Sequence, residues 1–335
     1  MPRRIGIVGF RGYSGAELVH ILKRHPGVET VLLEHRQDTE HRAEPIGRTP
    51  LPRIPATAGA AAAESVALVF LATPPEVSMD LAPAFLEKGI KVVDLSGAFR
   101  LRTFENYKRW YKDDHTAAGL LAEAVYGLPE FNRALVPGAR LVSNPGCYPT
   151  AANLAIRPLV RAGLLDRSAG IVCDAKSGVS GAGRKASLKT SFCEVTENFS
   201  AYSILDHRHV PEVLLTSDLE EGEFSFSAQL IPIDRGILET IYVRMNPGVT
   251  AEAILAAYQS QYANEPFVRL YHPPHVPDLH AVRRTNFCDI GFKYDASTGR
   301  AVIVSVIDNL VKGAAGQAIQ NMNLALGYAE TESLL

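Results

Sequence analysis

The sequence has little cysteine, a single tryptophan and almost no net charge. Its 335 residues include four cysteines, at positions 147, 173, 193 and 288, and no two of them form a C-x-x-C pair. This spacing favours neither a zinc site nor a disulfide framework, so no metal is expected. The formal net charge of -2 gives no reason to expect nucleic acid or an anionic membrane as a partner.

Long apolar runs are also missing. No run reaches the roughly 18 residues that would indicate a membrane span. The chain begins Met-Pro-Arg-Arg and then enters a short apolar stretch, Ile5 to Val8. A signal peptide would need a longer apolar segment and a small-residue cleavage site. We therefore expect a cytoplasmic protein, in which a free cysteine serves either packing or chemistry.

The first 145 residues alternate predicted strands and helices. Strands are expected at 4–9, 28–33, 66–72 and 91–95, and helices at 14–24 and 78–87. Continuous apolar runs are typical of strands that are buried on both faces of a parallel sheet. Ser14 and Glu17 fit a capping box at the start of the first helix. The rhythm predicts an α/β fold, with a Rossmann-type doubly wound sheet in a dinucleotide-binding domain over residues 1–146.

Longer strands predominate after about residue 150. They are expected at 169–174, 224–232, 238–245, 286–294 and 301–307, with helices at 151–162, 208–220 and 250–262. This pattern predicts a second, α+β domain over residues 147–309 with a mixed or antiparallel sheet. A final helix within 310–330 carries one apolar stripe and is expected to return to the first domain.

A glycine-rich turn follows the first predicted strand and opens the first helix. It has the spacing G-x-x-G-x-x-G and comprises Gly9, Arg11, Gly12, Tyr13, Ser14 and Gly15. Glycines there permit a tight turn and let backbone amides approach a pyrophosphate at the helix N-terminus. The strand–turn–helix setting favours a dinucleotide site over a glycine-rich turn without a ligand.

The end of the second predicted strand bears on the choice between NAD and NADP. Glu34 stands 19 residues after Gly15, where an acid would bond the ribose 2′-hydroxyl of NAD. Arg36 and Arg11 could instead hold the 2′-phosphate of NADP. The residues leave both cofactors open.

The stretch Ser143–Thr150, SNPGCYPT, is the most informative one. Pro145 and Gly146 predict a turn, and Pro149 suits the first turn of a following helix. Cys147 is therefore expected at a helix N-terminus, where the helix dipole stabilises a thiolate and makes it a good covalent nucleophile. A lone cysteine is more often a small buried hydrophobe. The other cysteines lie in apolar or strand-like runs and keep that interpretation: Cys173, Cys193 and Cys288.

Two further loops carry polar side chains. Ser177–Arg184, SGVSGAGR, is rich in N–H donors and ends in a cation, which suits an anionic substrate group; the alternative is a mobile surface loop. His207–Glu212, HRHVPE, precedes a predicted helix. One histidine as the acid–base partner of Cys147 is a simpler hypothesis than a metal pair, because no third ligand is evident nearby.

These residues resemble the N-acetyl-gamma-glutamyl-phosphate reductase family, which is related to aspartate-semialdehyde dehydrogenase. The matching stretches run nearly end to end: GFRGYSGAEL (9–18), 71–75, DLSGAFRL (94–101), YGLPE (126–130), SNPGCYPT (143–150), 177–184, HRHVPE (207–212), PFVR (266–269) and 308–317. SNPGCYPT and YGLPE together are quite specific. The resemblance implies Cys147 as nucleophile and His207 or His209 as the acid–base group. It also implies NADPH as cofactor and a homo-oligomer, a dimer or tetramer, with the second domain serving catalysis and oligomerisation.

The resemblance assigns further roles. It implies that the cofactor is bordered by Thr73, Pro74, Ser177, Gly178 and Asn309, and that the substrate meets Arg100, Asn144, Ser180, Arg184 and Glu212, with Ser177 a candidate for both. Two departures leave NADP preference open. Glu34-His35-Arg36 stands where the family has a small residue and Ser-Arg, and Phe10-Arg11 replaces Ala-Thr in the glycine-rich turn at residues 9–15.

The implied reaction reduces N-acetyl-gamma-glutamyl phosphate to the 5-semialdehyde. The Cys147 thiolate attacks the acyl-phosphate carbonyl and expels phosphate, and hydride from NADPH reduces the resulting thioester. Proton transfer is assigned to His209, with His207 as the rival. The nearest alternative is the same reaction on N-acetyl-aminoadipyl phosphate, because one methylene is worth only about 1–3 kcal/mol in a pocket. A dinucleotide-sensing binding protein and a cysteine hydrolase are rivals of other classes.

Overall fold

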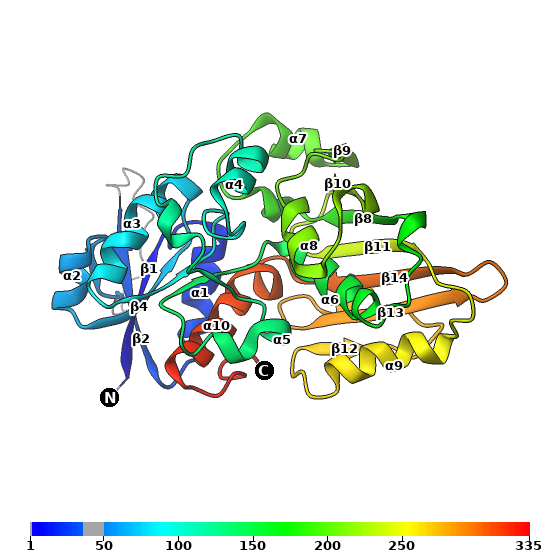
Figure 1. Cartoon of the computed structure of the whole chain (residues 1–335). Coiled ribbons are helices and arrows are strands. Elements are labelled where there is room, and N and C mark those ends of the chain that lie inside the picture. Colours follow the sequence, from blue (N-terminus) through cyan, green and yellow to red (C-terminus); the bar gives the residue numbers. More distant parts are fainter. Residues whose placement is uncertain (1, 36–49) are drawn as a thin grey trace. The chain divides into compact units, whose positions relative to one another are not determined.

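The computed structural model describes residues 2–35 and 50–335, which fold as two compact units (Figure 1). The first unit comprises the chain up to Phe104, residues 114–144 and residues 318–334. The second comprises residues 105–113, 145–317 and Leu335. Arg36, one of the candidates for the 2′-phosphate, lies outside the described residues.

The first unit is built on a seven-stranded sheet in the order β3-β2-β1-β4-β5-β7-β6, in which every neighbouring pair is parallel. Its strands are β1 Arg3–Val8, β2 Val28–Glu34, β3 Arg53–Pro55, β4 Val66–Leu71, β5 Lys91–Asp94, β6 Val125–Tyr126 and β7 Leu141–Ser143. The apolar runs of β1 and β4 are buried at the centre of the sheet. The predicted doubly wound sheet is confirmed.

Helices connect these parallel strands. They are α1 Tyr13–Leu22, α2 Ala58–Ala63, α3 Pro75–Glu87 and the short α5 Pro129–Asn132. The predicted capping box is wrong, because α1 begins one residue before Ser14, with Gly12 as its N-cap and no side chain capping it. The backbone amide of Ala16 donates to the Gly12 carbonyl over 2.9 Å, which is the first i→i−4 bond of the helix. The first amides of α1 are therefore presented by the glycine turn itself.

The second unit holds a mixed seven-stranded sheet in the order β12-β13-β14-β11-β8-β10-β9. Its strands are β8 Ile171–Ser177, β9 Ser200–Tyr202, β10 Phe224–Leu230, β11 Ile237–Arg244, β12 Val268–Leu270, β13 Cys288–Asp295 and β14 Arg300–Ile307. β8 pairs with β10 and β12 with β13 in parallel, and the other pairs are antiparallel. A mixed sheet is what the long strands predicted.

One face of this sheet is covered by helices. α6 Cys147–Arg161 packs on β11 and β14 and against α8 Val210–Ser217 and α9 Ala251–Tyr262. Side chains therefore alternate along the strands between buried and accessible, as in β8, where Cys173 is fully buried and Val172 is 44% exposed. Tyr242 of β11 is 46% exposed on that accessible face.

The last helical segment changes its character along its length. Val311–Ala315 forms a single π-helical turn, labelled η8, and α10 Gly316–Leu326 continues it. A continuous α-helix was expected from the apolar stripe, so the π turn is a correction. From Ala318 onward the segment belongs to the first unit. There Asn321 Nδ2 donates to the Gly127 carbonyl over 2.8 Å.

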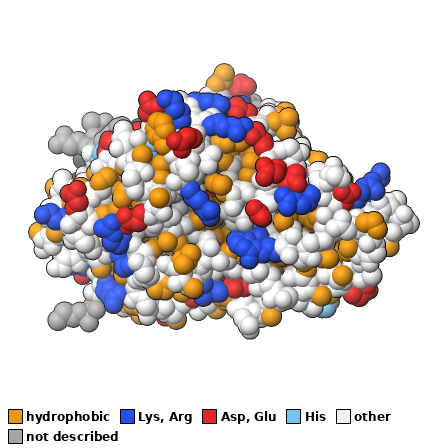
Figure 2. Space-filling view, in the orientation of Figure 1, with side chains coloured by type: hydrophobic (Ala, Val, Ile, Leu, Met, Phe, Trp, Pro, Cys, Tyr) orange, Lys and Arg blue, Asp and Glu red, His pale blue; other side chains and the backbone are white. Residues whose placement is uncertain are grey.

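Basic and acidic side chains intermingle over the face shown in Figure 2, in keeping with the small net charge.

Two short helices complete the second unit, α4 Phe104–Tyr111, which begins at its border, and α7 Phe192–Val195. No helix in the described part of the chain is both long enough and apolar enough to cross a bilayer.

Candidate active site

Cys147 is the first residue of α6, as the sequence predicts. Gly146 is the N-cap and has an extended backbone. Because it is a glycine, it contributes no side-chain cap to the helix. Its backbone amide donates to Glu212 Oε2 over 2.9 Å, and Glu212 is only 1% exposed. Cys147 itself is partly accessible. The start of the helix is thus anchored by a buried carboxylate, while the thiol stays reachable.

A cavity of about 380 Å³ opens in the second unit, with Cys147 in its wall. Both predicted acid–base candidates line it, together with Ser177 of the segment Ser177–Arg184, which is called the glycine loop from here on. The sequence analysis missed the other polar side chains of its lining, among them Tyr148, Tyr202, Lys189, Asp206 and Arg208. The cavity therefore combines a thiol, two imidazoles, two phenols and two cations.

The two histidines differ in their surroundings. His207 and His209 are 7% and 8% exposed, and the backbone amide of His209 donates to His207 Nδ1 over 3.2 Å. Burial, and then the positive charge of Arg208, lower the pKa of His207 to about 4. His207 is therefore neutral at physiological pH and carries its proton on Nε2.

His209 lies against the residue that precedes Cys147. A Cβ atom placed on Gly146 would lie 2.8 Å from His209 Nε2 and 2.9 Å from Glu212 Oε1. Only glycine leaves room there for both side chains. The imidazole and the carboxylate are accordingly held beside the N-terminus of α6, one residue from Cys147.

The two tyrosines flank the histidines. The hydroxyl groups of Tyr148 and Tyr202 are 3.1 Å apart, and their rings lie 5.5 Å and 5.7 Å from the ring of His207. Burial raises the pKa of both Tyr148 and Tyr202. Both phenols therefore remain protonated at neutral pH and can serve as hydrogen-bond donors.

The cations that line the cavity are not those that the sequence singled out. Lys189 follows the glycine loop, in the short turn η5 Leu188–Thr190, and its Nζ lies 5.4 Å from the centre of the Tyr202 ring. Arg208 stands between the two histidines and also lines the cavity. Sequence reasoning favoured Arg184 because it ends the glycine loop. No local motif marks Lys189, which lies in the long segment between β8 and β9.

The remaining substrate candidates lie elsewhere. Arg100 is 8% exposed in the first unit, where its guanidinium donates to the carbonyls of Asn144, over 2.8 Å, and Leu95, over 2.9 Å. Asn144 and Ser180 are 1% and 7% exposed. Arg184 is exposed on the second unit. All four stay predictions.

Ser180 is bound from below by Asn309. The side-chain amide of Asn309 donates to Ser180 Oγ over 3.0 Å and accepts from the Gly236 backbone amide over 2.7 Å. Gly178 donates its own amide to the Gly236 carbonyl over 2.9 Å. These bonds tie the glycine loop to β11 within the second unit. The proposed contacts of Gly178 and Asn309 with the cofactor stay predictions.

The other predicted cofactor residues come together at one edge of the first sheet. Gly9 has φ of +79°, and a Cβ on it would lie 2.2 Å from the Ala72 carbonyl oxygen, just before Thr73 and Pro74. A Cβ on Gly15 would lie 2.3 Å from the Gly9 carbonyl oxygen. The turns after β1 and β4 therefore pack closely at the carboxyl edge, where doubly wound sheets bind nucleotides.

Glu34 ends β2 at that same edge. Arg11 Nη2 lies 3.3 Å from Glu34 Oε1, and Arg53 Nη1 lies 3.8 Å from the same oxygen. The Glu34 side chain is 39% exposed. One carboxylate and two guanidinium groups thus lie where the sequence predicts that the ribose binds.

The cysteines outside the cavity fall into two kinds. Cys173 and Cys288 are fully buried, as the packing interpretation requires. Cys193 is exposed on α7, so the packing interpretation is wrong for this residue. Its apolar neighbours in the sequence, Phe192 among them, are themselves exposed.

Comparison with known proteins agrees with this geometry. The family described as semialdehyde dehydrogenase, NAD binding domain, matches residues 4–139, and the one described as semialdehyde dehydrogenase, dimerisation domain, matches residues 147–309. N-acetyl-gamma-glutamyl-phosphate reductase of Geobacillus sp. (strain WCH70) is 45% identical over 99% of this chain and 98% of the relative. The enzyme of the same name from Symbiobacterium thermophilum is 46% identical over 100% and 98%.

Solved structures share the fold at low sequence identity. Aspartate semialdehyde dehydrogenase II of Vibrio cholerae superposes with a TM-score of 0.71 at 16% identity, over 98% of this chain and 99% of the other. The Candida albicans enzyme, solved with NADP, gives a TM-score of 0.70 at 15% identity, over 97% and 98%. The chain belongs to the N-acetyl-gamma-glutamyl-phosphate reductase family of the semialdehyde dehydrogenases.

Proposed function

We propose that this chain reduces N-acetyl-gamma-glutamyl phosphate to N-acetylglutamate 5-semialdehyde, with NADPH as donor and release of phosphate, in arginine biosynthesis. The observation that carries the proposal is the position of Cys147, an accessible thiol on the first residue of α6 in a cavity with both histidines. A helix N-terminus favours the thiolate form of a cysteine. The full-length relatives of this name support the choice of substrate.

Cys147 attacks the carbonyl of the acyl phosphate, and the bond to the phosphate oxygen breaks, which leaves a thioester on the protein and free phosphate. When bound, NADPH supplies the hydride that reduces this thioester. His209 gives a proton to the oxyanion that reduction leaves on the former carbonyl oxygen, and takes that proton back as the carbon–sulfur bond breaks, which releases the aldehyde and restores the Cys147 thiolate. His207, neutral and protonated on Nε2, serves as a hydrogen-bond donor to the substrate in the same cavity.

The two cations of the cavity suit a doubly anionic substrate. N-acetyl-gamma-glutamyl phosphate carries a phosphate at one end and an α-carboxylate at the other, and Lys189 and Arg208 are the lysine and arginine in the lining. We assign the phosphate and the carboxylate to this pair, with Ser177 as a hydrogen-bond donor. Glu212 supports the site by holding the Gly146 amide.

The first unit fits a dinucleotide. The cradle of Gly9, Gly12 and Gly15 has no room for side chains at its first and last glycine, and the uncapped N-terminus of α1 suits a pyrophosphate. Arg11 and Arg53 flank the ribose corner and favour the 2′-phosphate of NADPH, whereas Glu34 between them favours the 2′-hydroxyl of NAD. We assign NADPH as the preferred donor.

The chain is also proposed to form a homo-oligomer through its second unit. The accessible sheet face, with Val172 and Tyr242 about half exposed, is a broad partly apolar surface of the kind that pairs in dimers. The region 147–309 matches a family described by its dimerisation domain.

The experiment is a reverse assay, in which N-acetylglutamate semialdehyde is oxidised in the presence of inorganic phosphate. NADP and NAD are run in parallel, and N-acetyl-aminoadipate semialdehyde is the matched control substrate. Phosphate-dependent reduction of NADP, faster with the glutamate semialdehyde, is the expected result. Faster turnover of the longer semialdehyde would move the enzyme to lysine biosynthesis, and no turnover of either would refute the proposal.

A further inference from the structure

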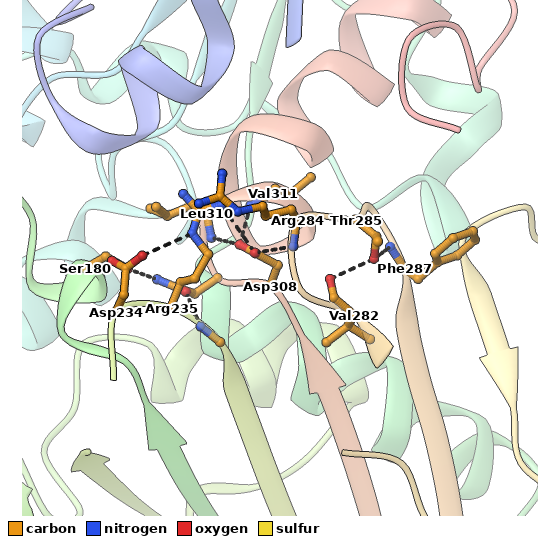
Figure 3. Close-up of polar contacts among 12 residues, drawn as sticks. Ser180, Asp234, Arg235, Val282, Arg284, Thr285, Phe287, Asp308, Leu310 and Val311 are labelled. Carbon is orange, nitrogen blue, oxygen red and sulfur yellow. Dashed lines mark hydrogen bonds and ion pairs between the residues drawn. The ribbon is translucent and has the colours of Figure 1, made fainter. Parts of the chain in front are cut away.

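Two consecutive buried residues join the walls of the candidate active site. Asp308 and Asn309 follow β14 directly and are 0% and 2% exposed. Neither belongs to the cavity lining. Their side chains point in different directions, Asp308 toward the turn that carries Gly313 and Asn309 toward the glycine loop. Figure 3 shows the polar contacts that surround them.

The Asp308 carboxylate binds four donors from three segments of the chain. Its Oδ1 accepts from the backbone amides of Leu310, over 2.9 Å, and Val311, over 3.1 Å. Its Oδ2 accepts from the backbone amide of Arg284, over 2.7 Å, and lies 3.4 Å from Arg235 Nη1 (Figure 3). Both oxygens of this fully buried anion are therefore engaged, and its charge is balanced by Arg235, whose side chain is 8% exposed.

One of these donors sits in an unfavourable backbone conformation. Arg284 has φ of +61°, in the left-handed region that residues with a side chain rarely adopt. Its amide donates to the Asp308 carboxylate, and the hydroxyl of the next residue, Thr285, donates to the Val282 carbonyl over 2.7 Å. Strain of this kind persists where surrounding contacts over-determine it, often next to functional sites.

The turn that Asp308 starts is the surface on which the nucleophile rests. The amide of Gly313 donates to the Asp308 carbonyl over 2.9 Å, and that of Ala315 to the Leu310 carbonyl over 2.8 Å, which makes the π-helical turn η8. A Cβ on Gly313 would lie 2.8 Å from the Cβ of Cys147. Single π turns occur frequently at functional sites. Here the wider turn places a bare backbone against Cys147.

Asn309 acts on the opposite wall. Its Nδ2 donates to Ser180 Oγ and its Oδ1 accepts from the Gly236 amide, as described above. Gly181 and Ala182, which follow Ser180, line the cavity, and a Cβ on Gly181 would lie 3.7 Å from Asn309 Nδ2. Asn309 therefore fixes the position of the glycine loop in the cavity wall.

We propose that Asp308 and Asn309 are positioning residues, which set the distance between Cys147 and the glycine loop. Asp308 fixes the turn behind the thiol, and Asn309 fixes the loop facing it, so that one dipeptide controls both walls. The proposal rests on the proposed role of Cys147 as nucleophile. A displacement of about 1 Å at a reacting atom can cost on the order of 100-fold in rate. The two residues therefore act on turnover more than on substrate affinity.

The test uses Asp308→Asn in the full-length protein, with Asp289→Asn as the matched control. Asp289 is also a fully buried aspartate, paired with Arg269 at 2.6 and 2.8 Å, but it lies on β13 outside the cavity lining. Both substitutions remove one buried negative charge from an arginine and keep the side-chain shape. All proteins carry Cys193→Ser, because Cys193 is exposed and would otherwise react with thiol reagents, whereas Cys173 and Cys288 are buried.

Two readouts separate positioning from mere stability. In the reverse assay, Asp308→Asn should lower kcat by at least tenfold while the KM values for the semialdehyde and for phosphate change less than threefold. The midpoint of the pH dependence of Cys147 alkylation by iodoacetamide should rise, because the thiolate loses its fixed place at the helix N-terminus. Asp289→Asn should keep the wild-type kcat and the wild-type midpoint at a comparable loss of thermal stability.

Equal effects of the two substitutions on kcat, or a wild-type kcat in Asp308→Asn, would overturn the proposal. If Asp308→Asn does not fold, Asn309→Ala decides, since it leaves the carboxylate and Arg235 intact. It should lower kcat by at least tenfold with the KM for NADP changed less than threefold. An unchanged kcat, or a loss that appears mainly in the KM for NADP, would overturn the proposal. If the wild type has no phosphate-dependent activity, the proposed function fails, and the alkylation midpoints still decide whether Asp308 positions Cys147.

Discussion

The backbone amide of His209 donates a hydrogen bond to Nδ1 of His207, over 3.2 Å, inside the wall of the cavity. This bond requires His207 to be unprotonated on Nδ1, and burial disfavours the imidazolium as well. The two histidines of HRHVPE therefore have different chemistry although they stand two residues apart. His207 is held neutral as a hydrogen-bond donor, and His209 lies beside the residue that precedes Cys147.

His207 should make the folded state less stable in acid. Its folded pKa of about 4 lies below the ordinary 6.5, so between these values the unfolded chain binds more protons. The stability is complete above about pH 6.5 and is lost as the pH falls, with a cost of about 2 kcal/mol by pH 5. His207→Asn should remove this loss while its side-chain oxygen still accepts from the His209 amide. Urea unfolding at pH 7.5 and pH 5 measures it, and an unchanged slope in the variant would contradict the assignment.

His209→Asn should lower turnover more than His207→Asn. His209 Nε2 and Glu212 both approach Gly146, next to the thiol, whereas His207 Nδ1 is occupied by a backbone amide. Loss of an acid–base group costs about 100-fold or more in rate, and loss of one neutral donor costs less. Steady-state kcat of both variants in the reverse assay decides. The opposite ranking would move the acid–base role to His207.

Cys147→Ser should abolish reduction of the acyl phosphate and leave binding of the dinucleotide nearly intact. The hydroxyl of serine keeps the shape but has no accessible anionic form at neutral pH, so the thioester cannot form. Fluorescence titration with NADPH provides the control for folding and cofactor binding. Turnover at the wild-type rate in this variant would refute the covalent route.

Glu34→Ser should shift selectivity toward NADPH. The substitution removes the carboxylate that pairs with Arg11 and Arg53 and leaves both cations for a 2′-phosphate. We expect the ratio of kcat/KM for NADPH to that for NADH to rise by about tenfold, the size of one charge-assisted contact at a part-exposed site. Arg53→Ser is the matched variant and should lower the ratio. A flat ratio in Glu34→Ser means that Glu34 is only a solvated partner of the arginines.

Glu239→Gln should stabilise the protein at alkaline pH. Glu239 is fully buried on β11 beside Cys173, and burial raises its pKa well above the ordinary value. Stability linked to this group is complete below its unfolded pKa and falls as the pH rises, by up to about 1.4 kcal/mol per pH unit until the folded carboxyl ionises. The stability difference between the variant and the wild type should therefore grow from pH 5 to pH 8 in urea titrations. A constant difference would show that the carboxyl is already ionised in the folded state.

The elements that the sequence predicts well are those whose pattern is local. β8 alternates buried and accessible residues, and β4 is a continuous apolar run, so both strands can be predicted from their own residues. The strands that escaped prediction are short: β3, β6, β7, β9 and β12 have three residues or fewer. Each owes its conformation to a neighbouring strand that lies elsewhere in the sequence, which a local pattern cannot reveal.

The site was predictable to a similar degree. Cys147 stood out because Gly146 and Pro149 mark a helix start around it, and the structure has α6 beginning there. Lys189 and Tyr202 carry no such marker: Lys189 lies in the long segment before β9, and the pairing of β9 with β10 places Tyr202 in the cavity wall. The capping box failed because a glycine turn can begin a helix without a side-chain cap.

The first unit is discontinuous, because the chain leaves it at Asn144 and re-enters it at Ala318. Its last residues contact earlier parts of the unit. Asn321 Nδ2 donates to the Gly127 carbonyl, and Asn323 Oδ1 lies 3.1 Å from His25 Nε2. During synthesis, the first unit cannot complete these contacts until residues 145–317 of the second unit have been translated. A stop codon at or before Asn321 would remove both contacts, and would therefore affect the structure around Gly127 and His25 as well as the last helix.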